Sequence, residues 1–177
     1  MKTLPLLNAL AAVFLGISLG SVPVVAAPLP TQHYLTNEVA IEAALAALST
    51  CKAAGQHVSV SVLNSSGMEL IAIHDEHASI HGAYSAHAKA YTVLSYTYSS
   101  GESTTSEIVK RITKDPAAIA RINGIPGLIL ANGGVLIKFG DEVVGAIGVG
   151  GTPGGVKVGD EECAKAGVEK IKDRLHP

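Results

Sequence analysis

The chain has 177 residues, a formal net charge of −2 and few charged side chains, 16% of the total. A protein that binds DNA or RNA needs a basic surface to neutralise phosphates, and this composition offers none, so we expect no nucleic-acid partner. The sequence contains no Trp and two Phe. A core must therefore be built from Ala, Val, Ile and Leu.

The N-terminal segment has the composition of a secretory signal peptide. A positive start at Lys2 is followed by a mainly apolar stretch over residues 4–19 and then by small residues up to Ala27. Cleavage after Ala26 or Ala27 meets the small-residue rule of signal peptidase. A membrane anchor is the alternative, but it needs about 20 apolar residues in a row and this stretch is shorter.

We therefore expect residues 1–26 to be removed and residues 27–177 to form a single domain, either periplasmic or secreted. Removing one lysine leaves 12 basic and 15 acidic side chains, a net charge of −3. Two cysteines, Cys51 and Cys163, would then be in an oxidising compartment. They are expected either to form one disulfide or to remain two buried thiols, and their spacing does not decide between the two.

The first half of the exported part is expected to form a helix, a hairpin and a second helix. Thr36 is suited to cap a helix that runs to about residue 54, before Gly55. Residues 57–63 alternate Val with Ser and predict a strand, and residues 68–73 predict its hairpin partner. Residues 79–98, rich in Ala and Tyr, predict the second helix.

The second half begins with two short helices, over residues 102–113 and 115–121, the latter with Asp115 as its cap and Pro116 in its first turn. Three strands and a closing helix are expected after a glycine-containing segment: 128–130, 135–139, 143–149 and 160–175. Hairpins dominate this order. It predicts an α/β fold of the α+β kind, in which helices pack against a mainly antiparallel, five-stranded sheet.

No motif for phosphate binding or catalysis is recognisable. Gly133-Gly134 and residues 148–155 lack the strand–GxGxxG–helix context and the Lys-Ser/Thr ending of a phosphate loop, so tight turns and close packing explain them better. The sequence has no HExxH motif and no paired-carboxylate signature. We expect a binding protein rather than an enzyme. The alternative is an enzyme, or an accessory subunit of one, that processes a small molecule.

Four of the seven histidines fall between positions 74 and 87. Imidazole is a common ligand of haem iron and of zinc or copper. If the second helix begins early, His77 and His81 lie one turn apart, with Tyr84 continuing their face as a wall for a flat ring. His87 then lies on another face. The alternative is a solvated surface patch, of which His74 would also be part.

Two further candidates lie outside that cluster. His33 precedes the first helix and is placed to cap a pocket. Lys89 is suited to pair with a haem propionate or with another carboxylate. We predict that the protein binds a haem or, alternatively, a divalent metal ion. The ligand is expected to be His33, His77, His81 or His87, with Tyr84 and Lys89 nearby.

Seven stretches of the chain carry a family resemblance: 35–36, 60–67, 86–92, 126–127, 133–137, 142–151 and 160–164. Together, in this order, they resemble the GlcG/HbpS family of haem-binding domains, also found as the C-terminal domain of PduO-type proteins. The glycine-rich stretch 142–151 is the most specific. Residues 74–77 and 99–113 depart from the family pattern, so no ligand is carried over from the second of these segments.

The resemblance implies a profilin-like domain with a central antiparallel sheet and assembly into homo-oligomers. For some members it also implies haem binding or haem-linked sensing outside the cell. Combined with the predicted signal peptide, it favours an exported haem-binding protein that acts as a carrier, a scavenger or a component of an extracellular sensor. A further hypothesis is that the protein is an oligomer that assists a membrane sensor.

Overall fold

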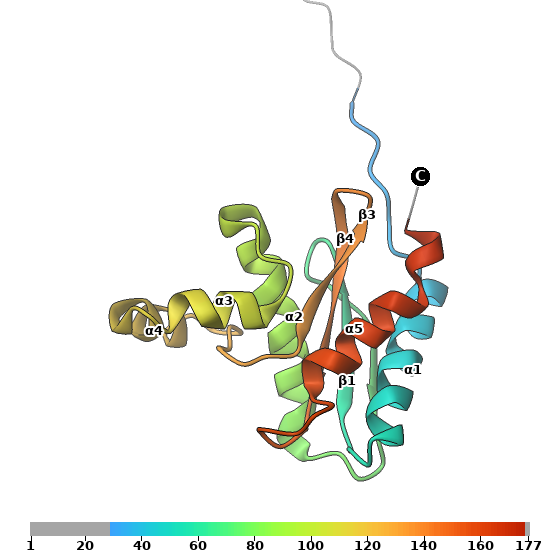
Figure 1. Ribbon diagram of the computed structural model, residues 1–177. Helices are drawn as coiled ribbons and strands as arrows, with labels where there is room; N and C mark the ends of the chain where they lie inside the picture. Colours follow the sequence, from blue (N-terminus) through green and yellow to red (C-terminus); the bar gives the residue numbers. More distant parts are fainter. Residues whose placement is uncertain (1–28, 176–177) are drawn as a thin grey trace, which may run out of the picture. The chain divides into compact units, whose positions relative to one another are not determined.

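The computed structural model of the protein describes residues 29–175, and its contacts divide the chain into two units, residues 1–31 and 32–177. The second unit contains ten elements, labelled in Figure 1: α1 (Asn37–Ala53), β1 (Ser59–Asn64), β2 (Glu69–His74), α2 (Ile80–Ser100), α3 (Thr105–Ile112), α4 (Pro116–Asn123), β3 (Gly134–Phe139), β4 (Glu142–Gly150), α5 (Asp160–Lys170) and a 3₁₀ turn (Lys172–Arg174). The predicted signal peptide lies outside the described residues.

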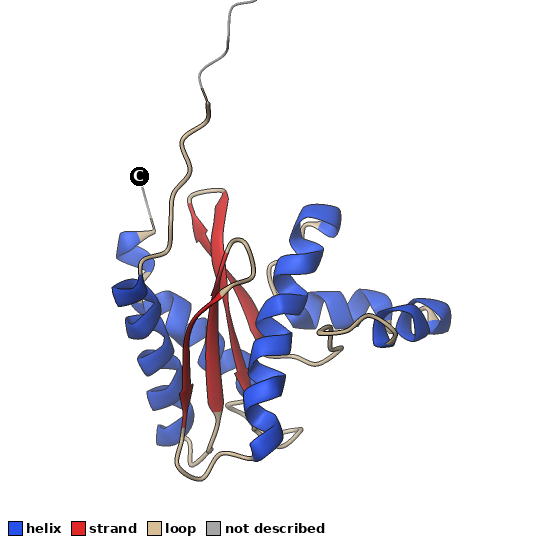
Figure 2. Ribbon diagram, turned by 180° about the vertical axis from the view of Figure 1, so that it is seen from behind, coloured by secondary structure: helices blue, strands red, loops and turns tan. Residues whose placement is uncertain are grey.

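The four strands form one antiparallel sheet in the order β2-β1-β4-β3. Helix α2 covers one face, and α1 and α5 cover the other, so the sheet lies between two helical layers (Figure 2). The α+β class and the antiparallel sheet are therefore confirmed. The finer likeness to profilin stays a prediction.

The prediction of five strands is wrong, because residues 128–130 form no strand. The outer edge of β3 is already used by the segment before α3: Thr104 forms a bridge with Val135, and the N–H of Leu136 donates to the carbonyl of Ser103. The N–H of Ile129 instead donates to the hydroxyl of Thr92 in α2, at 2.9 Å. The apolar run that predicted a strand packs as an irregular segment.

Glycines of β3 and β4 let α2 approach the sheet closely. A Cβ atom on Gly148 would lie 2.0 Å from the carbonyl oxygen of Ala86, and one on Gly134 would lie 2.2 Å from that of Lys89. These two glycines are paired across the sheet. Any larger residue would force the helix away, so close packing against α2 explains Gly134 and Gly148.

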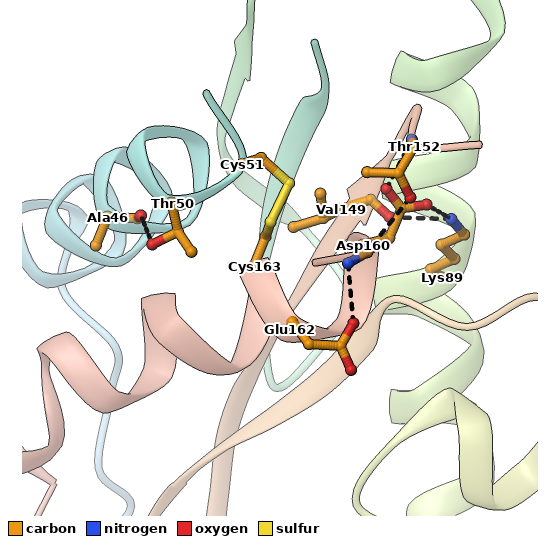
Figure 3. Close-up of a disulfide and its surroundings, with 10 residues drawn as sticks. Ala46, Thr50, Cys51, Lys89, Val149, Thr152, Asp160, Glu162 and Cys163 are labelled. Atoms are coloured by element: carbon orange, nitrogen blue, oxygen red, sulfur yellow. Dashed lines mark hydrogen bonds and ion pairs between the residues drawn. A yellow bond between two sulfur atoms is a disulfide. The ribbon is translucent and has the colours of Figure 1, made fainter. Parts of the chain in front are cut away.

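On the opposite face, α1 packs against α5 through small residues. One side of α1 is completely buried and consists of four alanines and a cysteine at helical spacing: Ala40, Ala43, Ala44, Ala47 and Cys51. Cys51 forms a disulfide with Cys163 of α5, with the two Cα atoms 5.6 Å apart (Figure 3). The structure thus decides between the disulfide and the two free thiols that the sequence left open.

The helix ends agree with the capping signals. The Thr36 hydroxyl accepts a hydrogen bond from the N–H of Val39, and the Asp115 carboxylate accepts one from the N–H of Ala117. The closing helix is shorter than predicted, because α5 ends at Lys170 and continues only as a 3₁₀ turn. Among residues 29–175, no helix combines the length and the hydropathy that a crossing of the bilayer requires.

Candidate functional site

The histidines of the predicted cluster are distributed over three elements. Helix α2 begins at Ile80, so His77 lies in the turn before it and does not share a helix face with His81. His74 is the last residue of β2, and His81 lies exposed in the first turn of α2. The one-turn spacing that would have let His77 and His81 bind a single ion is therefore not formed.

His87 is the histidine of α2 whose ring is held by a carboxylate. Its Nδ1 lies 3.3 Å from a carboxylate oxygen of Glu69 in β2, and that same oxygen accepts a 2.6 Å hydrogen bond from the hydroxyl of Ser61. The ring stacks with that of Tyr91 at a centroid distance of 6.4 Å. With Nδ1 bonded to Glu69, the Nε2 atom is the one left for a ligand.

Large side chains at intervals of four, three and four residues form an exposed surface on α2, which we call the α2 stripe: Ile80, Tyr84, His87 and Tyr91. Ile80 is 99% exposed and Tyr84 62% exposed. An apolar side chain as exposed as Ile80 has no packing role within the molecule, so this stripe is available for contact with a ligand or a second molecule.

His33 lies at a different place, next to the start of β4. Its ring stacks on Phe139 at a centroid distance of 4.1 Å, and its Nδ1 lies 2.6 Å from the carboxylate of Glu142. The backbone N–H of His33 also donates to this carboxylate. These two hydrogen bonds lower the pKa of Glu142, and the bond from the ring of His33 has the larger effect. The adjoining cavity, of about 180 Å³, also includes Arg174.

Lys89 points away from the stripe and toward the core. Its ammonium is 2.5 Å from the carboxylate of Asp160 and donates to the carbonyl of Val149 at 3.0 Å (Figure 3). Both side chains are more than nine-tenths buried. The carboxylate partner that the sequence left open is therefore Asp160. The pair lines a cavity of about 620 Å³, whose walls include Ser106, Asn132 and the loop 152–156.

The predicted ligands do not converge on one centre. Within the described residues, no three His, Cys, Asp or Glu side chains gather closely enough to hold a metal ion together. No pattern in the sequence pointed to the carboxylates that hold the histidines, because each lies 18 or more positions from its partner: Glu69, Asp75 and Glu142. The assignment of a ligand among His33, His77, His81 and His87 stays a prediction.

The family model described as "Haem degrading protein HbpS-like" matches residues 35–169, which run from before α1 to the last turn of α5. The chain belongs to the HbpS-like family. The resemblance noted in the sequence is thereby confirmed. No curated protein matches the chain significantly.

Solved structures agree with this membership. HbpS is 34% identical, with a TM-score of 0.68, and the match covers 82% of this chain and 97% of HbpS. A double mutant of HbpS from Streptomyces reticuli is 32% identical, with a TM-score of 0.69, and covers 84% and 96% of the two chains. A complex of PduOC with heme has the same fold at 18% identity, with a TM-score of 0.66 and coverage of 78% and 96%.

Proposed function

We propose that this HbpS-like protein is an exported haem-binding protein, a carrier, scavenger or sensor component, and that His87 on the α2 stripe is its iron ligand. The observation that carries the assignment is the Glu69–His87 contact, in which a carboxylate holds Nδ1 of an imidazole and leaves Nε2 for the ligand. Histidines that bind metals are usually oriented in this way, which fixes their tautomer and raises their basicity.

The neighbourhood of His87 suits a flat apolar ring. Tyr91 stacks beside the imidazole, and Tyr84 and Ile80 extend the same exposed surface by two further steps of the helix. When bound, haem would supply the iron, together with the iron's ligand-binding chemistry and redox chemistry. The protein's residues would hold the iron through His87 and cover the porphyrin with the aromatic side chains.

Neither of the two cavities described above is as suitable. The cavity beside His33 has a volume of about 180 Å³, below the range of about 300–1,000 Å³ that is usual for small-molecule sites. The cavity of about 620 Å³ contains no histidine, and the ammonium of Lys89 in its wall is already paired with Asp160. Lys89 therefore does not support the idea of a propionate partner.

Homo-oligomer formation and a membrane sensor as a partner belong to the same proposal. A haem lying on an open helix face keeps one side in water, and a second molecule placed over the stripe would remove that surface from solvent. Export follows from the signal-peptide composition of residues 1–26. N-terminal sequencing of protein released from cells should begin at Ala27 or Pro28, and an unprocessed chain would contradict export.

A second candidate function is the degradation of haem, because the matching family model carries that description. It corresponds to the enzymatic alternative left open by the sequence. A bound haem whose Soret absorption disappears in the presence of a reductant and oxygen, with release of iron, would identify it. A stable spectrum under the same conditions would favour binding without turnover.

Haem titration tests the proposal. The wild-type protein should give a Soret band near 400 nm that saturates with added ferric haem. His87→Ala should weaken binding by at least about tenfold, because the iron loses an oriented ligand. His74→Ala is the matched control, since it removes an exposed histidine at the neighbouring sheet edge and should bind as the wild type does.

The remaining candidates make the outcome decisive. If His33→Ala, His77→Ala or His81→Ala loses affinity while His87→Ala does not, haem binding stands but the ligand assignment is wrong. If all four variants bind as the wild type does, the histidines are a solvated patch. If the wild-type protein gives no saturable Soret band, the proposed function itself is wrong.

A further inference from the structure

The loop before β1 and the turn after β2 bring together two histidines that do not belong to the α2 stripe. The N–H of Asp75 donates to the carbonyl of Val58 at 3.0 Å, which ties the two segments side by side at the lower end of the molecule in Figure 1. The rings of His57 and His77 lie there with centroids 5.2 Å apart, at right angles to each other.

A buried carboxylate organises this pair. The side chain of Asp75 is completely buried, and one of its oxygens lies 2.7 Å from Nδ1 of His57 and accepts a 3.0 Å hydrogen bond from the N–H of His77. The contact with Asp75 leaves Nε2 of His57 as the nitrogen for a ligand. Both imidazoles reach solvent, and within the described residues no hydrogen bond holds the ring of His77.

The separation of the rings is that of two imidazoles on one ion. Metal–nitrogen bonds of about 2.0–2.1 Å and a tetrahedral angle place two ring centres about 5 Å apart. We infer that His57 and His77 are the two protein ligands of a site for a divalent first-row transition metal such as Zn²⁺. Because the two rings are perpendicular, binding of one ion requires the exposed His77 ring to turn one of its nitrogens toward Nε2 of His57.

The local charge favours a cation. Lys52 is 3.3 Å from the second oxygen of Asp75 and 3.2 Å from the carboxylate of Glu76, so one ammonium faces two carboxylates beside the two imidazoles. Imidazole suits Zn²⁺, Cu²⁺ and Ni²⁺ better than the oxygen-seeking Mg²⁺ or Ca²⁺. Two protein ligands leave further coordination positions to water, the arrangement of an open site rather than of a closed structural one.

This inference goes beyond haem binding and does not depend on it. His57 is outside the predicted ligand set, and the pair lies in loops that flank the sheet, whereas His87 is bound to Glu69 from the side of α2. Loss of the metal site should therefore leave the haem titration unchanged, and loss of His87 should leave metal binding unchanged.

Zinc titration of the untagged, haem-free protein tests the inference. Calorimetry should show one Zn²⁺ ion per chain, and NMR should show zinc-dependent shifts of the ring protons of His57 and His77. His57→Ala and His77→Ala should each weaken binding by at least about tenfold, because each removes one of two ligands. His81→Ala is the matched control and should bind zinc as the wild type does.

The same control separates this site from the pairing that the sequence suggested. If His81→Ala and His77→Ala abolish binding while His57→Ala does not, the inference is wrong and the ion is held at the start of α2. Absence of stoichiometric zinc binding also overturns it. His57→Ala leaves Asp75 without its ring partner. His57→Asn, whose amide nitrogen takes the place of Nδ1, therefore separates lost ligation from lost folding.

Discussion

At the scale of single residues, the recurring feature is a histidine whose Nδ1 faces a carboxylate. It occurs three times in the described residues, as His33–Glu142, His57–Asp75 and His87–Glu69. The middle pair contains the most protected carboxyl. The N–H of His77, the ring of His57 and the ammonium of Lys52 all favour its charged form and, against the opposing effect of burial, lower the pKa of Asp75 from 3.8 to about 2.

This shift predicts a dependence of stability on acid. Above pH 3.8 the carboxyl is ionised in the folded and the unfolded chain, and its contribution to stability is complete. As the pH falls from 3.8 toward 2, the unfolded chain takes up the proton first, so this contribution is progressively lost. Asp75→Asn should therefore be less stable than the wild type at pH 7 and lose less stability between pH 5 and pH 2.

Urea unfolding at a series of pH values measures this difference. Asp141→Asn, which changes an exposed carboxyl in the turn between β3 and β4, should follow the wild type throughout. Parallel losses of stability in Asp75→Asn and the wild type across this range would show that the buried contacts of Asp75 do not control the acid response.

At the scale of elements, the N-terminal half of α5 is fixed to both helical layers. The disulfide joins it to α1, and the Asp160–Lys89 ion pair joins it to α2 (Figure 3). The Asp160 carboxylate also accepts a hydrogen bond from the N–H of Thr152. The loop between β4 and α5, which lines the larger cavity, is thereby held at both ends.

The disulfide should contribute strongly to stability because it closes a loop of 112 residues. Cross-links of this kind restrict the unfolded chain and typically contribute about 2–5 kcal/mol. We expect the free energy of unfolding of the double variant Cys51→Ala, Cys163→Ala to be lower by that amount. The variant should therefore unfold at a lower urea concentration. A reductant should lower the midpoint of the wild type but not of the variant, and a thiol assay on the unreduced, unfolded wild type should detect no free thiol.

At the scale of the whole molecule, we predict a homo-oligomer, at least a dimer. The α2 stripe exposes large apolar and aromatic side chains, β2 is an edge strand of the sheet, and the net charge of −2 adds little repulsion between copies. Light scattering at micromolar concentration should give at least twice the mass of one chain. A strictly monomeric species over this range would contradict the prediction.

The sequence by itself was sufficient for the features that depend on near neighbours. Thr36 and Asp115 cap helices because their side chains reach N–H groups two or three residues away, and the Val–Ser alternation of residues 57–63 predicted a strand at the position of β1. The order of the motifs along the chain was also sufficient to recognise the family. The local signal failed at residues 128–130, where a short apolar run has no periodicity that separates a strand from an irregular packed segment.

Only the tertiary structure decided which distant side chains meet. Lys89 and Asp160 are 71 positions apart, and His87 and Glu69 are 18 apart, so no spacing rule connects them. The same holds for Cys51 and Cys163. These partners depend on the way α2 packs onto glycines of β3 and β4 and α1 packs onto α5, and therefore on the whole sheet. The residue types indicate which chemistry is available, and the packing determines which side chains are paired.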